Sequence, residues 1–180
     1  MRLKNTALAL GVVAVLVTAG SGTSAAQQGG AAQQAGPSYS LEGAWFGMAS
    51  ITGFQPTPSL DTFTSNAQRK GNEGTFLCTI PTMQMPIPGG VLTFTASGHG
   101  NWVRIAKNTY AFTAVRSIVD QAGMPFGWAK FWGTITAISE DEYSGTMNAQ
   151  FYTLDGTAFS PLFTGTLASR RIPIQFENQQ

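Results

Sequence analysis

The side chain best suited to proton transfer in this sequence is its only histidine. His99 lies in Ser97-Gly98-His99-Gly100, and flanking glycines predict a shaped turn because they adopt backbone angles that other residues avoid. An imidazole that titrates near neutral pH can act as a general acid or base. We therefore predict that His99 is a candidate catalytic residue. The structural alternative is a histidine that packs against or caps the turn.

Arg116 and Tyr110 are the other two candidate catalytic residues. Alternation along a strand puts Tyr110, Phe112 and Arg116 on one face. If that face points inward, the guanidinium must be paired or must face a ligand, because an unpaired buried charge is costly. The alternative is a charge on a solvated outer face. Arg104 and Lys130 also lie on strands and pose the same question. Possible carboxylate partners at or near strands are Asp61, Glu42 and Glu73.

Aromatic side chains provide candidate ligand contacts. The predicted ligand-binding residues are Trp102, Phe112, Trp128 and Trp132, with Met83 and Met85 as parts of a lid. Trp128 and Trp132 share one face of their strand, while Ala129 and Phe131 share the other, and the sequence leaves open which face points inward. Trp45, in Gly43-Ala44-Trp45, is expected to plug one end of the core.

Several kinds of chemistry find no support in the sequence. One histidine and one cysteine, Cys78, cannot complete a typical zinc shell, so we predict no metal site and no cofactor. The acidic turn Glu140-Asp141-Glu142 lacks the interleaved ligands of calcium loops. The Gly-x-Ser-x-Gly motif and phosphate-binding glycine loops are absent. Cys78 cannot form an internal disulfide, and we interpret it as a small buried residue on a strand.

The pattern that must position these residues is a series of short strands. After residue 40, runs rich in Thr, Val, Ile and aromatic residues alternate with Gly, Pro, Asn and Asp. Segment 81–90 contains three prolines and is expected to be a rim loop outside the sheet. We predict an all-β fold, a single antiparallel up-and-down barrel of about eight strands, with a β-sandwich as the alternative. The expected strands are 42–52, 60–65, 74–80, 91–95, 102–105, 110–119, 128–138, 143–154 and 162–174.

The N-terminal region predicts export. Arg2 and Lys4 precede an apolar run at 7–19 and a small-residue stretch at 21–26, which is the layout of a secretory signal. The apolar run is shorter than the roughly 20 residues of a membrane-spanning helix. We predict a signal peptide at 1–26, a disordered tether at 27–38, a barrel domain at 39–176 and a tail at 177–180. The mature protein is then periplasmic or extracellular and has no transmembrane segment.

The charge of the predicted mature chain is nearly balanced. Without Arg2 and Lys4, eight basic residues face nine acidic ones, a net charge near −1. No basic run stands out, so nucleic acid is not an expected partner.

Short motifs resemble those of known barrels. Gly43-Ala44-Trp45 resembles the calycin-like barrels, in which a Gly-x-Trp on the first strand closes one end of an apolar-ligand cavity. The turn 98–102, the Asp120 to Gly123 hairpin and the ending 165–172 resemble a group of small exported bacterial proteins of unassigned role. The barrel of allene oxide cyclases is also similar in strand number and in lacking a cofactor. No cyclase motif matches this sequence, so that resemblance implies no site residues.

The leading functional hypothesis is a secreted or periplasmic barrel that binds a small, largely apolar or aromatic molecule. A cofactor-free isomerase, cyclase or lyase acting inside the same barrel is the first alternative. The second is a structural or interaction domain with a plugged core. A roomy interior that contains Arg116 would favour binding or catalysis over the plugged barrel.

Overall fold

The computed structural model describes residues 37–69 and 71–173. The predicted signal peptide, nearly all of the predicted tether and the predicted tail lie outside these residues. Within the described part, no helix is long and apolar enough to span a membrane.

In the described part of the chain, nine antiparallel strands and one short 3-10 turn, η1 (Ala67–Arg69), form the fold. The strands are β1 (Gly43–Ile51), β2 (Thr57–Ser65), β3 (Glu73–Thr79), β4 (Met83–Ile87), β5 (Gly90–Ala106), β6 (Thr109–Val119), β7 (Pro125–Ala137), β8 (Glu142–Thr153) and β9 (Phe163–Arg171).

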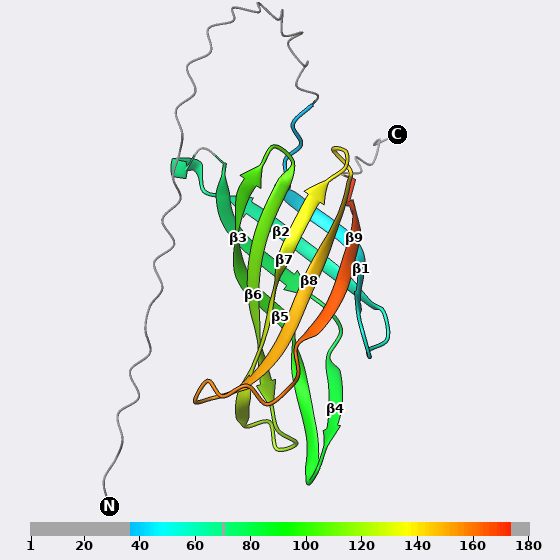
Figure 1. Ribbon diagram of the computed structural model, residues 1–180, viewed down its shortest axis with the longest axis vertical. Coiled ribbons are helices and arrows are strands. Elements are labelled where there is room, and N and C mark those ends of the chain that lie inside the picture. Colours follow the sequence, from blue (N-terminus) through cyan, green and yellow to red (C-terminus); the bar gives the residue numbers. More distant parts are fainter. Residues whose placement is uncertain (1–36, 70, 174–180) are drawn as a thin grey trace, which may run out of the picture. The chain divides into compact units, whose positions relative to one another are not determined.

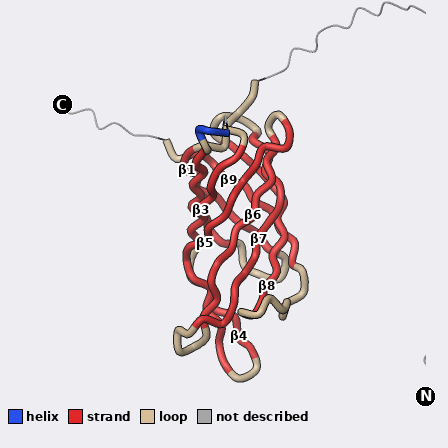
Figure 2. Tube along the Cα trace, turned by 90° about the vertical axis from the view of Figure 1, so that its left-hand side faces the viewer, coloured by secondary structure: helices blue, strands red, loops and turns tan. Residues whose placement is uncertain are grey.

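The strands close into a barrel, because every strand except β4 pairs with its neighbours around the barrel, β9 pairs with β1, and β3 pairs directly with β5. β4 pairs only with β5 and extends beyond the eight closed strands as an arm (Figures 1 and 2). The predicted all-β, up-and-down barrel is confirmed. Closure gives each of the eight barrel strands two neighbours and creates an interior, while β4 keeps one free edge.

Two local predictions about β4 and β5 are wrong. Segment 81–90 is not a loop: Met83–Ile87 is strand β4, with Pro86 opposite Val91. A proline is tolerated because β4 has only one partner, so the nitrogen can face its free edge. The hairpin turns at Pro88-Gly89, where Gly89 has φ of 88°, as a type II turn requires.

The glycines around His99 do not make a turn either. β5 runs without a break from Gly90 to Ala106, with an irregularity between Phe94 and Gly98 opposite β6. An interior glycine in a strand often marks a bulge or a close approach of backbone rather than a chain reversal. His99 therefore lies in mid-strand.

Burial decides which strand faces point inward. On β6 the buried set is Tyr110, Phe112, Ala114, Arg116 and Ile118. On β7 it includes Ala129, Phe131, Ile135 and Ala137. Aromatic and aliphatic side chains of alternate residues thus fill the barrel, as the period of two along a strand requires.

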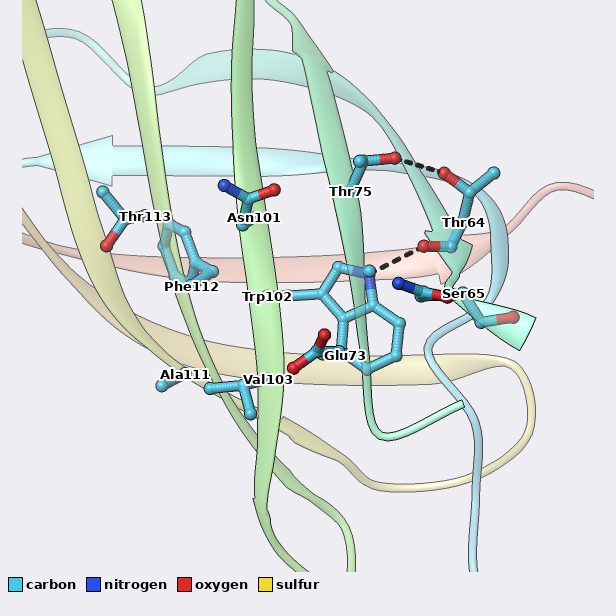
Figure 3. Close-up of a pocket in the computed structure, with 12 residues that line it drawn as sticks. Thr64, Ser65, Glu73, Thr75, Asn101, Trp102, Val103, Ala111, Phe112 and Thr113 are labelled. Carbon is cyan, nitrogen blue, oxygen red and sulfur yellow. Dashed lines mark hydrogen bonds between the residues drawn. The ribbon is translucent and has the colours of Figure 1, made fainter. Parts of the chain in front are cut away.

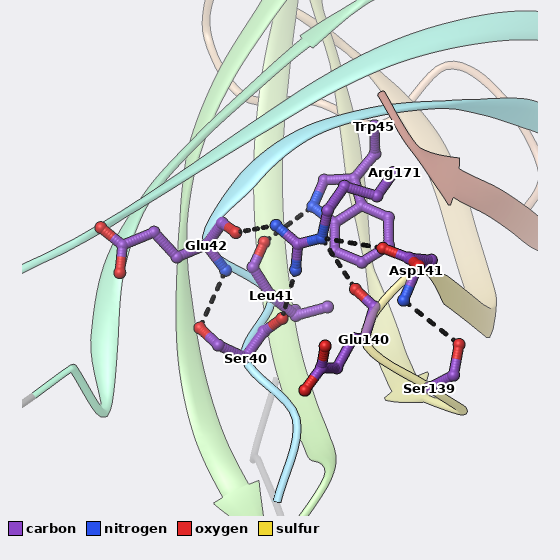
Figure 4. Close-up of polar contacts among 8 residues, drawn as sticks. All are labelled: Ser40, Leu41, Glu42, Trp45, Ser139, Glu140, Asp141 and Arg171. Atoms are coloured by element: carbon purple, nitrogen blue, oxygen red, sulfur yellow. Dashed lines mark hydrogen bonds and ion pairs between the residues drawn. The ribbon is translucent and has the colours of Figure 1, made fainter. Parts of the chain in front are cut away.

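Trp45 closes one end of the barrel, which we call the Trp45 end. Its side chain is fully buried and its indole nitrogen donates to the Leu41 carbonyl at 2.7 Å. The Arg171 guanidinium lies over the indole ring, 4.3 Å from the ring centroid (Figure 4). This arrangement agrees with the expected plugging role of Trp45.

Arg171 also fastens the chain around that plug. Its guanidinium donates to the carbonyls of Ser40 at 3.0 Å, Glu42 at 2.5 Å and Glu140 at 2.7 Å. Gly43 has φ of 128°, and a Cβ there would lie 2.4 Å from Nη1 of Arg171. Glycine at position 43 therefore allows both the backbone angle and the approach of the guanidinium.

The opposite end, which we call the β4 end, is covered by side chains rather than by a hydrogen-bonded plug. Phe54, in the β1–β2 loop, packs edge-on against Phe163 at 5.1 Å and Phe151 at 6.4 Å between ring centroids. Met83 of β4 packs on the same core. This end is apolar and its covering residues are only partly buried.

Candidate functional site

A row of inward-facing residues crosses the middle of the barrel. Asp61 on β2 is opposite Cys78 on β3, Cys78 is opposite Gly98 on β5, and Gly98 is opposite Arg116 on β6. A Cβ on Gly98 would lie 2.7 Å from Sγ of Cys78 and 2.8 Å from Cγ of Arg116. The missing side chain therefore provides the space that Cys78 and Arg116 share.

Arg116 is the largest buried charged side chain of the row, with 1% of its surface exposed. Its Nε donates to the Thr95 carbonyl at 2.7 Å, and its Nη2 donates to the same oxygen. Thr95 lies in the β5 irregularity, which explains why its carbonyl is available. The remaining nitrogen, Nη1, is buried and makes no hydrogen bond.

Burial also affects the charge of Arg116. It lowers the pKa of the guanidinium to about 10, because a low-dielectric surrounding disfavours the charged form. The side chain nevertheless remains a cation at neutral pH. A buried cation with one free nitrogen is the most unusual polar feature of the interior.

Asp61 lies at the other end of the row and has its own partners. Its Oδ2 accepts hydrogen bonds from Tyr143 at 2.5 Å and from Ser59 at 3.2 Å. Burial raises the pKa of the Asp61 carboxyl above its usual value, although both hydrogen bonds act in the opposite direction. Burial, followed by the neighbouring Asp61, raises the pKa of Tyr143.

Cys78 lies between the two charged residues and is a free thiol. Burial, followed by the proximity of Asp61, raises the pKa of the thiol to about 11. At neutral pH it is therefore protonated and a poor nucleophile. The row is consequently better suited to holding a ligand than to covalent catalysis.

Two small cavities adjoin Arg116. The first, of about 40 Å³, lies among Asp61, Cys78, Arg116, Phe112 and Met147. The second, of about 20 Å³, reaches the β4 end at Phe54 and Met83. The residues that line both are Ala49, Ile51, Ile80, Arg116 and Phe131. A cavity needs about 10–15 Å³ of such space for one water molecule, so the barrel is nearly filled and has room for little more than water in this conformation.

Three predicted site residues face inward but differ in position. Phe112 lines the larger cavity and Met83 the smaller one. Tyr110 faces inward near the Trp45 end, where its hydroxyl donates to the Tyr39 carbonyl at 2.5 Å and accepts from Arg104 at 2.6 Å. It lines neither cavity, so the structure does not bring it together with Arg116.

Trp102 and Met85 are also buried or half-buried, and neither lines an inner cavity. The indole nitrogen of Trp102 donates to the Thr64 carbonyl at 3.2 Å, and its ring packs edge-on against Tyr110. Met85 packs against the core from β4. These residues serve the packing of the barrel ends.

His99, Trp128 and Trp132 lie on the outer face. His99 is exposed, since its neighbours Gly98 and Gly100 occupy the inward positions of β5. Alternation gives the inward positions of β7 to Ala129 and Phe131, so the two tryptophans do not line the interior. Trp128 stacks on Tyr152 at 5.8 Å, and the Lys130 ammonium lies 5.4 Å from the centre of the Trp132 ring. The structure therefore does not bring the candidate catalytic residue His99, or the predicted ligand-binding residues Trp128 and Trp132, together with the inner cavities.

Sequence reasoning missed Tyr143 and Ser59, which complete the polar group around Asp61. Their burial follows from strand alternation, since Ser59 and Asp61 are two residues apart on β2. Asp61 is one of three carboxylates, with Glu42 and Glu73, that the sequence offers as possible partners of Arg116. Instead, Arg116 takes part in none of the ion pairs found in residues 37–69 and 71–173.

A much larger hollow than the inner cavities lies on the outside of the barrel. It measures about 590 Å³ and is bordered by Thr64, Glu73, Thr75, Asn101 and Thr113 (Figure 3). It is a broad depression open to solvent, and Asp61, Cys78 and Arg116 do not border it. Nor do the described residues contain a group of three or more His, Cys, Asp or Glu side chains able to hold a metal.

The fold and its interior define a small closed antiparallel barrel with an apolar lining and a few buried polar groups. No protein-family model matches the sequence, and no curated protein matches it. One similar solved structure is described as EF1p2_mFAP2b bound to DFHBI, with a TM-score of 0.47, 16% identity, and coverage of 73% of this chain and 94% of that chain. Another is a redesigned beta barrel, b11L5F_LGL, with a TM-score of 0.40, 17% identity, and coverage of 74% and 92%.

Proposed function

We propose that this protein binds one small, largely apolar molecule inside the barrel, admitted through the β4 end. The observation that carries the proposal is the pair of inner cavities on either side of Arg116, one lined by Phe54 and Met83 and the other by Cys78 and Asp61. Apolar walls with a few convergent polar groups are typical of small-molecule sites.

The two ends of the barrel support entry from one side. Trp45 is fully buried beneath Arg171, which is tied to three carbonyls. The side chains of Phe54 and Met83 are only partly buried and pack against the core. Methionine is unbranched and flexible, so it can change rotamer to make room. A ligand larger than water displaces these two side chains and occupies the volume they release.

Two finer points belong to the same proposal. Export to the periplasm or outside the cell is supported by the basic, apolar and small-residue layout of residues 1–26. A calycin-like relationship is supported by Gly43 and Trp45 on the first strand, beside the closed end. The catalytic alternative is weaker, because His99 lies outside the barrel and Tyr110 is engaged at the Trp45 end.

The test is a fluorescence titration with the neutral apolar probe N-phenyl-1-naphthylamine. Ala49 faces inward and lines both cavities, so Ala49→Leu fills the space and should weaken binding at least ten-fold. Ala111 borders the outer depression instead, so Ala111→Leu is the matched control and should leave affinity unchanged.

Circular dichroism and urea unfolding must first show that both variants are folded. An absence of probe binding to the wild-type protein contradicts the proposal and favours a plugged structural barrel. A loss of affinity in Ala111→Leu equal to that in Ala49→Leu also contradicts it, because the probe would then bind outside.

A further inference from the structure

The guanidinium of Arg116 has one nitrogen with no hydrogen-bond partner among the residues that the structure describes. Nε and Nη2 are directed to the Thr95 carbonyl, and Nη1 is buried without a hydrogen bond. The contact with Thr95 explains a structural role for Arg116 in holding the β5 irregularity. That role does not account for Nη1, whose N–H groups are buried away from bulk water without a hydrogen-bond acceptor.

Among residues 37–69 and 71–173, no carboxylate forms an ion pair with Arg116. The ion pairs in the described part of the chain join Arg69 with Glu73, Arg170 with Glu142, and Arg171 with Asp141. Asp61, on the same inner row, uses its Oδ2 for Tyr143 and Ser59, and Cys78 and Gly98 separate it from Arg116. An unpaired buried cation is unfavourable unless an anion completes it.

We infer that the ligand is an apolar monocarboxylic acid whose carboxylate binds Nη1 of Arg116 in the middle of the barrel. This inference rests on the proposed function and adds the chemical class of the ligand. A carboxylate matches the planar guanidinium and gives a charge-assisted hydrogen bond.

The residues around Arg116 indicate the chemistry of the rest of the ligand. Ala114, Phe131 and Met147 line the larger cavity beside it, and Phe54 and Met83 lie toward the β4 end. A hydrocarbon or aromatic body therefore extends from Arg116 toward the β4 end. This orientation places the acid group at the inner end and the apolar part beneath the side chains that cover the opening.

The test compares two probes that differ only in charge, 4-phenylbutanoic acid and 4-phenylbutanamide, in displacing N-phenyl-1-naphthylamine at pH 7. The wild-type protein should bind the acid at least ten-fold more tightly than the amide. Arg116→Met should reduce this ratio to about one while the neutral reporter still binds. Arg104→Met is the matched control: Arg104 also has a buried unpaired nitrogen, Nε, but it lines neither cavity, so the ratio should persist.

The wild-type comparison decides the matter even if Arg116→Met does not fold. Equal affinities for acid and amide overturn the inference, and reporter binding then leaves the proposed function standing. A folded Arg116→Met protein that keeps the ten-fold preference also overturns it. If the reporter and both probes fail to bind the wild-type protein, the proposed function fails and this inference fails with it.

Discussion

Replacement of Arg171 by methionine should destabilise the barrel far more than the same change one residue earlier. Arg171 covers the Trp45 ring at 4.3 Å and donates to the carbonyls of Ser40, Glu42 and Glu140. These contacts join the segment before β1, the β7–β8 turn and the last strand. Methionine keeps much of the apolar stem but removes the guanidinium.

The magnitude follows from these contacts. A partly exposed cation–π contact is worth about 0.5–1 kcal/mol. Three hydrogen bonds from a charged donor would contribute about 1.5 kcal/mol each if buried. The three hydrogen bonds and the cation–π contact together amount to about 5 kcal/mol. The Arg171 side chain is 27% exposed, so water compensates for part of the loss, and we halve this sum. The expected loss is about 2–3 kcal/mol in the free energy of unfolding.

Arg170→Met is the control. The Arg170 side chain is 82% exposed and pairs with Glu142 at 3.1 Å, a surface contact worth about 0–0.5 kcal/mol. Urea unfolding followed by tryptophan fluorescence at pH 7 measures both variants, with the m-value as a check on two-state behaviour. A loss in Arg171→Met within 0.5 kcal/mol of that in Arg170→Met would refute this account of the closed end.

Three further predictions concern the inner row. Gly98→Ala should destabilise the fold by about 1–3 kcal/mol, because the added Cβ would lie within 2.8 Å of atoms of Cys78 and Arg116. Gly90→Ala is the control and should be tolerated, because its Cβ would have no contact closer than 3.9 Å. Equal urea midpoints for the two variants would contradict this prediction. Burial raises the pKa of the Cys78 thiol to about 11. At pH 8 the thiol should therefore react with iodoacetamide at least ten-fold more slowly in the folded protein than in urea. Equal rates would show that the thiol is accessible and ionised in the folded protein. Because burial raises the pKa of Asp61 above 3.8, the folded state retains a proton that the unfolded chain releases, so this contribution to stability is complete below pH 3.8 and declines as pH rises toward the folded value. Asp61→Asn cannot titrate there and should lack this decline in urea unfolding at pH 3–8; parallel profiles for the two proteins would contradict the assignment.

The strand content was predictable because alternation and turn residues are local signals. The run from Tyr110 to Val119 is a strand with the expected two faces. Local sequence does not determine which face of a strand is buried, because both faces of β7 carry aromatic residues. In the closed barrel, the face of β7 that carries Phe131 is buried, and the face that carries Trp128 and Trp132 lies outside.

The candidate site was only partly predictable for the same reason. Arg116 was recognised from its central position among inward residues, but its contact with Thr95 depends on an irregularity in β5 that the sequence did not reveal. The glycines beside His99 were interpreted as a turn, although at Gly98 the absence of a side chain makes room for Cys78 and Arg116. Tyr143 meets Asp61 across 82 residues of sequence, a contact that only tertiary structure creates.

The central claim, a ligand site inside the barrel, is tested most directly by a crystal structure of the protein with 4-phenylbutanoate. The account predicts the carboxylate within hydrogen-bond distance of Nη1 of Arg116, the phenyl ring toward the β4 end, and Phe54 and Met83 displaced from their present positions. An unchanged, filled interior with the ligand absent, or with the ligand in the outer depression near Asn101, would contradict it.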